Sequence, residues 1–194
     1  MKMRIKKKTT ISDKDNLILL CDTKSKLSGF NLSKKELEYI KKEQKDEKEI
    51  VVINHYGRYI IVILPKKEKD NNQHAENCRL IGDTLAGKLK DEKSAIIVDV
   101  KGNQIEAMQI AEGIALSNYT FTKHKTGGKA NKLETIYLCK DSSKKNIKEL
   151  QNIIDSVYLT RDLINEPFSH LTAKDLSESA RKVGKEYGFK TTVF

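Results

Sequence analysis

The segment EIVVINHYGRYIIVILPK, residues 49–66, contains two apolar runs separated by a short polar stretch. Runs rich in Val and Ile predict strands, and the Tyr56-Gly57 pair between them predicts a short turn. Pro65 cannot donate a backbone hydrogen bond, so we expect it to end the second strand. Because both runs are continuously apolar, helices are expected to cover the sheet on both faces.

Strands and helices alternate along the rest of the chain. The pattern predicts further strands at residues 16–22, which would be the first strand, and at 94–100, 132–140 and 189–194. Helices are expected at about 30–42, at 72–90, after Gly102, from Lys145 and after Thr172. This alternation predicts an α/β fold: a three-layer sandwich around a mixed, mostly parallel sheet, followed by a linker helix.

Several helix ends and apolar stripes can be read directly. Ser33 with Glu36, and Thr172 with Asp175, have the spacing of a capping box, and Gly188 suits a helix C-terminus. Three sets of residues are expected to share one helix face each, the last of them buried: Ile105, Met108, Ala111 and Ala115; Ile147, Leu150, Ile154, Val157 and Arg161; and Leu176, Ala180, Val183 and Tyr187.

Composition excludes some classes of protein and leaves one alternative open. No apolar run is long enough for a membrane span, and no secretory signal follows the basic N-terminus. Three widely spaced cysteines favour reduced thiols in the cytoplasm. The formal net charge of +10 permits binding to DNA. The excess is mostly lysine interleaved with acids, which is typical of a solvated surface, so DNA binding is kept as the alternative.

The short motifs do not assemble a catalytic, cofactor or metal site. HAEN, residues 74–77, resembles half of a zinc deaminase motif, but no Pro-Cys pair follows. His74 and Cys78 could share a helix face as zinc ligands, yet the other histidines lie in unrelated elements, so a partly buried thiol is the preferred interpretation. KTGGKAN, residues 125–131, lacks the Walker spacing and is interpreted as a flexible basic loop.

Two segments together resemble the leucyl aminopeptidase (cytosol aminopeptidase) family. The first, AEGIALSNYTFTKHKT at 111–126, is similar to a helix with Ala-Glu-Gly that runs into an aromatic segment. The second, TRDLINEPFSHLTAKDLSESARKVG at 160–184, is similar to the linker helix and the entrance to the catalytic domain. Thr160 replaces a usual Ala, and Ala173 stands where Pro often opens the helix.

The resemblance implies an N-terminal α/β domain with a macro-like fold, at residues 1–144, followed at 145–194 by the linker helix and the start of a C-terminal catalytic domain. In such proteins two divalent metals, zinc or manganese, activate water for removal of N-terminal amino acids from peptides, and the cytoplasmic subunits form hexamers. The ligand motifs of that centre do not occur in this sequence. We therefore expect an N-terminal piece of a longer protein, not catalytic alone, whose partner is its own C-terminal domain.

The same resemblance gives the linker a structural role. Arg161, Asp162 and Asn165 match the family's linker motif, and we expect them to stabilise the seam between domains without taking part in catalysis. The last helix is expected to keep an apolar face partly uncovered, because it would pack on the catalytic domain. Besides DNA binding, a nucleotide or ADP-ribose site at Gly127-Gly128 is a further alternative that rests on the macro-like fold alone.

Overall fold

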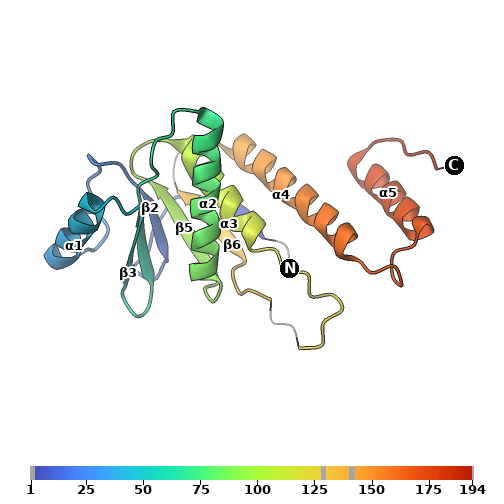
Figure 1. Cartoon of the computed structure of the whole chain (residues 1–194), viewed down its shortest axis with the longest axis horizontal. Coiled ribbons are helices and arrows are strands. Elements are labelled where there is room, and N and C mark those ends of the chain that lie inside the picture. The colour runs from blue at the N-terminus through green and yellow to red at the C-terminus, as the bar shows by residue number, and fades with distance from the viewer. Residues whose placement is uncertain (1–2, 128–129, 140–142, 194) are drawn as a thin grey trace. The chain divides into compact units, whose positions relative to one another are not determined.

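The computed structural model describes residues 3–127, 130–139 and 143–193. Within these ranges six strands and five helices alternate (Figure 1). Their bounds are β1 Arg4–Lys8, β2 Leu17–Leu20, α1 Lys34–Lys45, β3 Ile50–Asn54, β4 Tyr59–Ile63, α2 Asn71–Leu89, β5 Ser94–Asp99, α3 Gln104–Ser117, β6 Thr135–Cys139, α4 Lys144–Asn165 and α5 Ala173–Tyr187.

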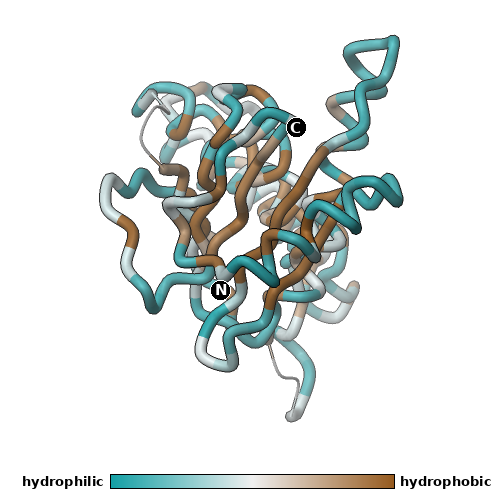
Figure 2. The backbone as a smooth tube through the Cα atoms, turned by 90° about the vertical axis from the view of Figure 1, so that its left-hand side faces the viewer, coloured by the Kyte–Doolittle hydropathy of each residue, from teal (hydrophilic) through white to brown (hydrophobic). Residues whose placement is uncertain are grey.

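The strands form one mixed sheet in the order β1-β6-β5-β2-β4-β3. All neighbours are parallel except β3 and β4, which form the antiparallel hairpin predicted around Tyr56-Gly57. Tyr56 has a positive φ of 61° at the turn. The central strands β2 and β4 are almost wholly buried and are among the most hydrophobic segments of the chain (Figure 2). The predicted α/β fold with a mostly parallel sheet is confirmed.

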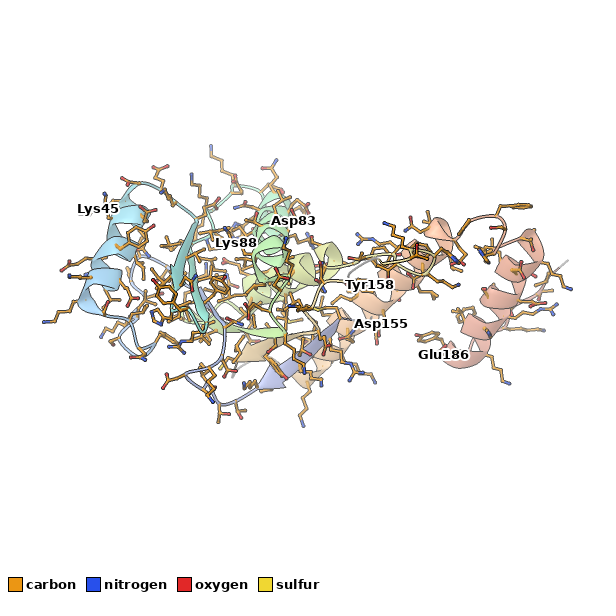
Figure 3. All side chains as sticks on the ribbon, turned by 90° about the horizontal axis from the view of Figure 1, so that it is seen from below. Lys45, Asp83, Lys88, Asp155, Tyr158 and Glu186 are labelled. Carbon is orange, nitrogen blue, oxygen red and sulfur yellow. The ribbon has the colours of Figure 1, made fainter. Side chains whose placement is uncertain are left out.

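Both faces of the sheet are covered by helices. Leu17 and Leu19 of β2 point to the face that packs on Ile40 of α1. The alternate residues Ile18 and Leu20 are also fully buried, which requires a layer on the opposite face. The helices α2 and α3 form that layer: they pack on each other, and α3 also packs on β5 and β6. Charged side chains such as Lys45, Asp83 and Lys88 project from the outer surfaces of α1 and α2 (Figure 3).

The predicted helix caps are confirmed. The Ser33 hydroxyl accepts a hydrogen bond from the Glu36 amide while the Glu36 carboxylate accepts from the Ser33 amide, so both halves of the box form at α1. Thr172 and Asp175 make the same pair of bonds at α5. Gly188 follows α5 in the left-handed conformation at φ 78°, a conformation that residues with a side chain rarely adopt.

Other sequence predictions need correction. Residues 16–22 do not hold the first strand, since the lysine-rich β1 precedes it. Residues 189–193 form no strand, and Phe194 lies outside the described residues. In α3 the side chain of Ile105 is exposed, because this helix is apolar on most sides and its buried face is the one carrying Ala107, Ile110 and Ile114.

The chain divides into two compact units, Met1–Asp155 and Ser156–Phe194, and the division falls within α4. The first unit holds the whole sheet. The second holds the end of α4, a corner at Pro167 and α5. The domain boundary predicted between residues 144 and 145 stays a prediction. No helix in the described ranges combines the length and the hydropathy that crossing a membrane requires.

The predicted buried stripe of α5 is largely uncovered. Leu176 and Tyr187 are 48% and 60% exposed, and Ala180 is exposed as well. Of the α5 residues only Gly184 is fully buried, under the backbone carbonyl of Phe189. The uncovered apolar face that the sequence suggested for this helix is therefore present in the second unit.

Candidate functional site

A pocket of about 710 Å³ lies where three parallel strands end, and we name it the carboxyl-edge pocket. Cys21 and Asp22 follow β2, residues 64–67 follow β4, and Lys101 and Asn103 lie in the loop after β5. The other lining residues are Thr23, Lys24, Gln44, Glu47, Lys48 and Glu106. All of them belong to the first unit.

The topology explains why a pocket forms at this edge. β2 and β5 are neighbours in the sheet, but the helices that follow them, α1 and α3, lie on opposite faces. The two connections therefore leave the sheet in opposite directions and open a crevice between them. In open α/β sheets this switch point, outside the carboxyl ends of the strands, is the usual place for a ligand.

Two tight turns shape the mouth of the pocket. The Asp22 carboxylate accepts hydrogen bonds from the Lys24 amide and the Ser25 hydroxyl, at 2.9 and 2.8 Å. The Ser25 hydrogen bond, with the Lys24 amide second, holds the pKa of Asp22 below its ordinary value. On the other side, Asp99 accepts from the Gly102 amide at 2.8 Å, and Gly102 has a φ of +81°. These turns fix the two loops that flank the crevice.

Lysines dominate the charge of the pocket, but several of them are paired with acids. Lys66 lies 3.6 Å from Glu47, and Lys48 forms an ion pair with Glu43. Lys101 contacts Glu106 Oε2 directly, and both side chains are nearly buried. The pocket is therefore lined by local ion pairs and not by an uncompensated field of positive charge.

Glu106 of α3, which lines the pocket, lies beside two further groups able to bind a metal: His74 and Cys78 on α2. One ligand atom from each lies within 4.8 Å of the others. His74 Nε2 is 3.0 Å from Glu106 Oε1, and Cys78 is fully buried. We name these residues the His-Cys-Glu cluster. Sequence reasoning missed Glu106, because it lies 28 positions beyond Cys78 on a different helix.

Neighbouring groups hold each member of the cluster. His74 Nδ1 lies 3.1 Å from the Lys66 carbonyl oxygen, and Asn103 Nδ2 donates to Glu106 Oε1 at 2.7 Å. Burial raises the pKa of the Cys78 thiol to about 11, and the nearby Glu106 carboxylate adds to the rise. The thiol is therefore protonated at neutral pH as long as no cation replaces the proton.

Close packing of α2 on α3 brings the cluster together. A Cβ atom added to Gly82 would lie 2.5 Å from the Ile110 carbonyl oxygen, and one added to Gly113 would lie 2.2 Å from the Arg79 carbonyl oxygen. Neither separation is compatible with a side chain, so the two glycines permit the backbones to touch. Cys78 lies one turn before Gly82, and the contact sets the distance from Cys78 to Glu106.

The other residues named from the sequence lie elsewhere. Glu76 of the HAEN motif is exposed and pairs with Arg79 at 3.4 Å. Gly127 has a φ of +82°, while Gly128 and Lys129 of the basic loop lie outside the described residues. Asp162 and Asn165 are exposed on the last turns of α4, and Asn165 Nδ2 donates to the Arg161 carbonyl at 2.8 Å. The seam role of these linker residues stays a prediction.

Comparison with known proteins shows which family this chain resembles. No protein-family model matches the sequence. A probable cytosol aminopeptidase from a Sulfurihydrogenibium species is 26% identical over 172 residues, which cover 80% of this chain and 34% of the relative. A probable cytosol aminopeptidase from Clostridium perfringens is 32% identical over 104 residues, 47% of this chain and 20% of the relative. The chain thus spans between a fifth and about a third of the length of these relatives.

Solved structures give the same result for the fold. A lysine-to-glutamate mutant of tomato leucine aminopeptidase superposes with a TM-score of 0.69 at 18% identity, covering 96% of this chain and 43% of the tomato chain. The bottromycin maturation enzyme BotP, in complex with Mn, gives a TM-score of 0.64 at 14% identity, covering 90% and 37% of the two chains. The chain therefore resembles the leucyl aminopeptidase (cytosol aminopeptidase) family in sequence over most of its own length, and it shares its fold with the tomato enzyme and with BotP.

Proposed function

We propose that this chain is the N-terminal, non-catalytic part of a leucyl aminopeptidase-like metallopeptidase that removes N-terminal amino acids from peptides. The observation that carries the proposal is the agreement of sequence and fold over most of this chain and a minor part of its relatives. The sequence match covers 80% of the chain, and the structural match covers 96%. Assembly or regulation is then the role of this part, and peptide hydrolysis belongs to the remainder of the protein.

The chemistry of the whole protein would use two divalent metal ions, zinc or manganese, in a separate C-terminal domain. Two such ions can activate a water molecule and stabilise the charge of a tetrahedral transition state. The residues described here do not fit that centre, because no group of potential metal ligands among them contains more than one carboxylate. BotP, which shares this fold, has a structure in complex with Mn, and this supports the proposal that the whole protein depends on a metal.

The proposed partners follow from the same assignment. They are the protein's own catalytic domain, further copies of the subunit in a hexamer, and a peptide substrate, all in the cytoplasm. The exposed apolar side chains of the second unit support a covering domain, since Phe168 and Phe189 are 81% and 53% exposed. Arg161, Asp162 and Asn165 would then stabilise the seam where that domain begins. We also propose that the N-terminal fold is macro-like.

The experiment is to read the native gene downstream of the codon for Phe194 and to assay the 194-residue chain by itself. We expect several hundred further codons that include a lysine and clustered Asp and Glu. The isolated chain should not release leucine from an aminoacyl amide in the presence of Mn²⁺ or Zn²⁺. A stop codon directly after Phe194 would contradict the two-domain proposal, and metal-dependent hydrolysis by the isolated chain would contradict the non-catalytic role.

A further inference from the structure

We propose that the His-Cys-Glu cluster, formed by His74, Cys78 and Glu106, binds one zinc ion. This site lies within the first unit. It rests on the geometry of α2 and α3 alone, so it holds whether or not the peptidase assignment does. Zinc is commonly coordinated by three protein ligands and one water molecule.

The distances suit this ion. With zinc bonds of 2.0–2.3 Å and tetrahedral angles, the ligand atoms of one site lie about 3.3–3.7 Å apart. The nitrogen, sulfur and oxygen of the cluster lie within 4.8 Å of one another, and the His74 to Glu106 separation is 3.0 Å. Side-chain movements that shift the ligand atoms by about 1 Å or less would therefore bring all three to bonding distance of one zinc ion. A mixed set of imidazole, thiolate and carboxylate favours zinc over the oxygen-binding ions Mg²⁺ and Ca²⁺.

The groups around the cluster are those that orient zinc ligands. A metal-binding histidine usually donates its second ring N–H to a backbone carbonyl or a carboxylate. His74 Nδ1 faces the Lys66 carbonyl at 3.1 Å, which directs Nε2 toward Glu106 and Cys78. Asn103 donates to the same carboxylate at 2.7 Å. Both ring nitrogens of His74 thus face oxygen atoms, and Nε2 is the one directed toward the cluster.

Lys101 is the group that opposes a cation here, since its ammonium contacts Glu106 Oε2. Two features reduce this opposition. The Cys78 thiol gives up its proton when it binds zinc, so the thiolate cancels one of the two positive charges that arrive. Lys101 contacts Oε2, while Oε1 is the oxygen that faces His74.

Solvent can reach the site from two sides. The side chain of His74 is 18% exposed, and Glu106 lines the carboxyl-edge pocket. An ion can therefore enter past His74 without unfolding α2, and the fourth ligand can be a water molecule from the pocket. The fully buried sulfur of Cys78 forms the inner side of the shell. This burial keeps the thiolate away from oxidants once the metal is bound.

The test uses the 194-residue chain without an affinity tag, reduced and stripped of metal with a chelator. Zinc is added in competition with a chromophoric chelator, and Co²⁺ serves as a spectroscopic probe. We expect one zinc per chain with a submicromolar dissociation constant, and a thiolate-to-cobalt charge-transfer band. The variants Cys78→Ser and Glu106→Gln should weaken zinc binding at least a hundredfold and tenfold, respectively.

Matched variants separate the site from adventitious binding. Cys139→Ser removes a buried thiol outside the cluster. His55→Gln removes a histidine that pairs with a carboxylate, Glu36, at 2.6 Å but belongs to no group of three potential metal ligands among the described residues. Both should bind zinc like the parent chain. Zinc affinity that is unchanged in Cys78→Ser, or equally weak in all variants, would overturn the proposal. The cobalt spectrum of the unsubstituted chain needs no variant to fold, and absence of the thiolate band would also overturn it.

Discussion

The contact between α2 and α3 makes a sharp prediction about Gly113. A Cβ atom in Gly113→Ala would lie 2.2 Å from the Arg79 carbonyl oxygen, whereas real Cβ contacts essentially never fall below 3.0 Å. The helices must therefore separate by at least about 0.8 Å at this point. A gap of this size loses a quarter to a half of the dispersion attraction between the atoms it parts.

The expected cost follows from two opposed effects. Overpacking of a well-packed interior costs about 1–3 kcal/mol, and a backbone clash places this case near the upper value. Alanine recovers about 0.8–1 kcal/mol through its better helix propensity. We expect Gly113→Ala to lose about 2 kcal/mol of unfolding free energy, which for a chain of this size lowers the melting temperature by roughly 4–8 °C. Zinc binding should weaken as well, because the clash moves Glu106 away from Cys78.

The same helix pair supplies the control. Gly87 lies in α2, and a Cβ added there meets no atom within 4 Å. Gly87→Ala should therefore stabilise the protein by about 0.5–1 kcal/mol through helix propensity and a less flexible unfolded chain. Thermal unfolding followed by circular dichroism and urea unfolding measure both variants. If Gly113→Ala were as stable as Gly87→Ala, the reasoning about helix contact would be refuted.

Three further predictions concern other parts of the first unit. Ser33→Ala removes the capping box of α1 and should cost about 1 kcal/mol in urea unfolding, and an unchanged midpoint would show that the box contributes nothing. Burial opposes ionisation of Asp15, but hydrogen bonds from Lys8 and Ser12 outweigh this effect and lower the pKa of its carboxyl group. The free energy of unfolding should therefore fall as the pH drops below about 3.8. In acid titrations the variant Asp15→Asn should show a smaller fall. Burial raises the pKa of Cys21 to about 12, so iodoacetamide at pH 8 should label native thiols far more slowly than urea-unfolded ones, and equal rates would disprove their burial.

Much of the fold was predictable because the relevant signals are local. The Ser33-Glu36 and Thr172-Asp175 boxes need only a spacing of three residues, and both form as predicted. The apolar runs of β4 and β5 needed no knowledge of their partners. β1 was missed because it is an edge strand whose sequence, RIKKK, buries little more than Ile5. Its only signal is one apolar residue among lysines, and pairing with the distant β6 turns that segment into a strand.

The candidate site was predictable only in part. The i, i+4 spacing of His74 and Cys78 offered two ligand groups on one helix face, but the sequence favoured a partly buried thiol over a zinc site. The third ligand depends on how α2 packs against α3, which the sequence does not state. The sequence shows Glu106 only as an acid in a mostly apolar segment; the structure shows that it is buried in a helix that otherwise buries only Ala, Gly and Ile. In the stripe predicted for α3, Ala111 and Ala115 are fully buried but Ile105 is exposed, because a mostly apolar helix gives little indication of which side faces the core.

The pairing of β1 with β6 has a consequence for how the protein is made. Arg4 pairs with Thr135, so the first strand synthesised waits for a partner about 130 residues later. At a translation rate of 5–20 residues per second, that wait lasts roughly 7–26 s. During this time β2, β4 and β5 can already pair with one another, while β1 still lacks β6, its neighbour in the sheet. The three lysines of β1 keep this waiting segment hydrated and charged, and so protect it from pairing with other nascent chains.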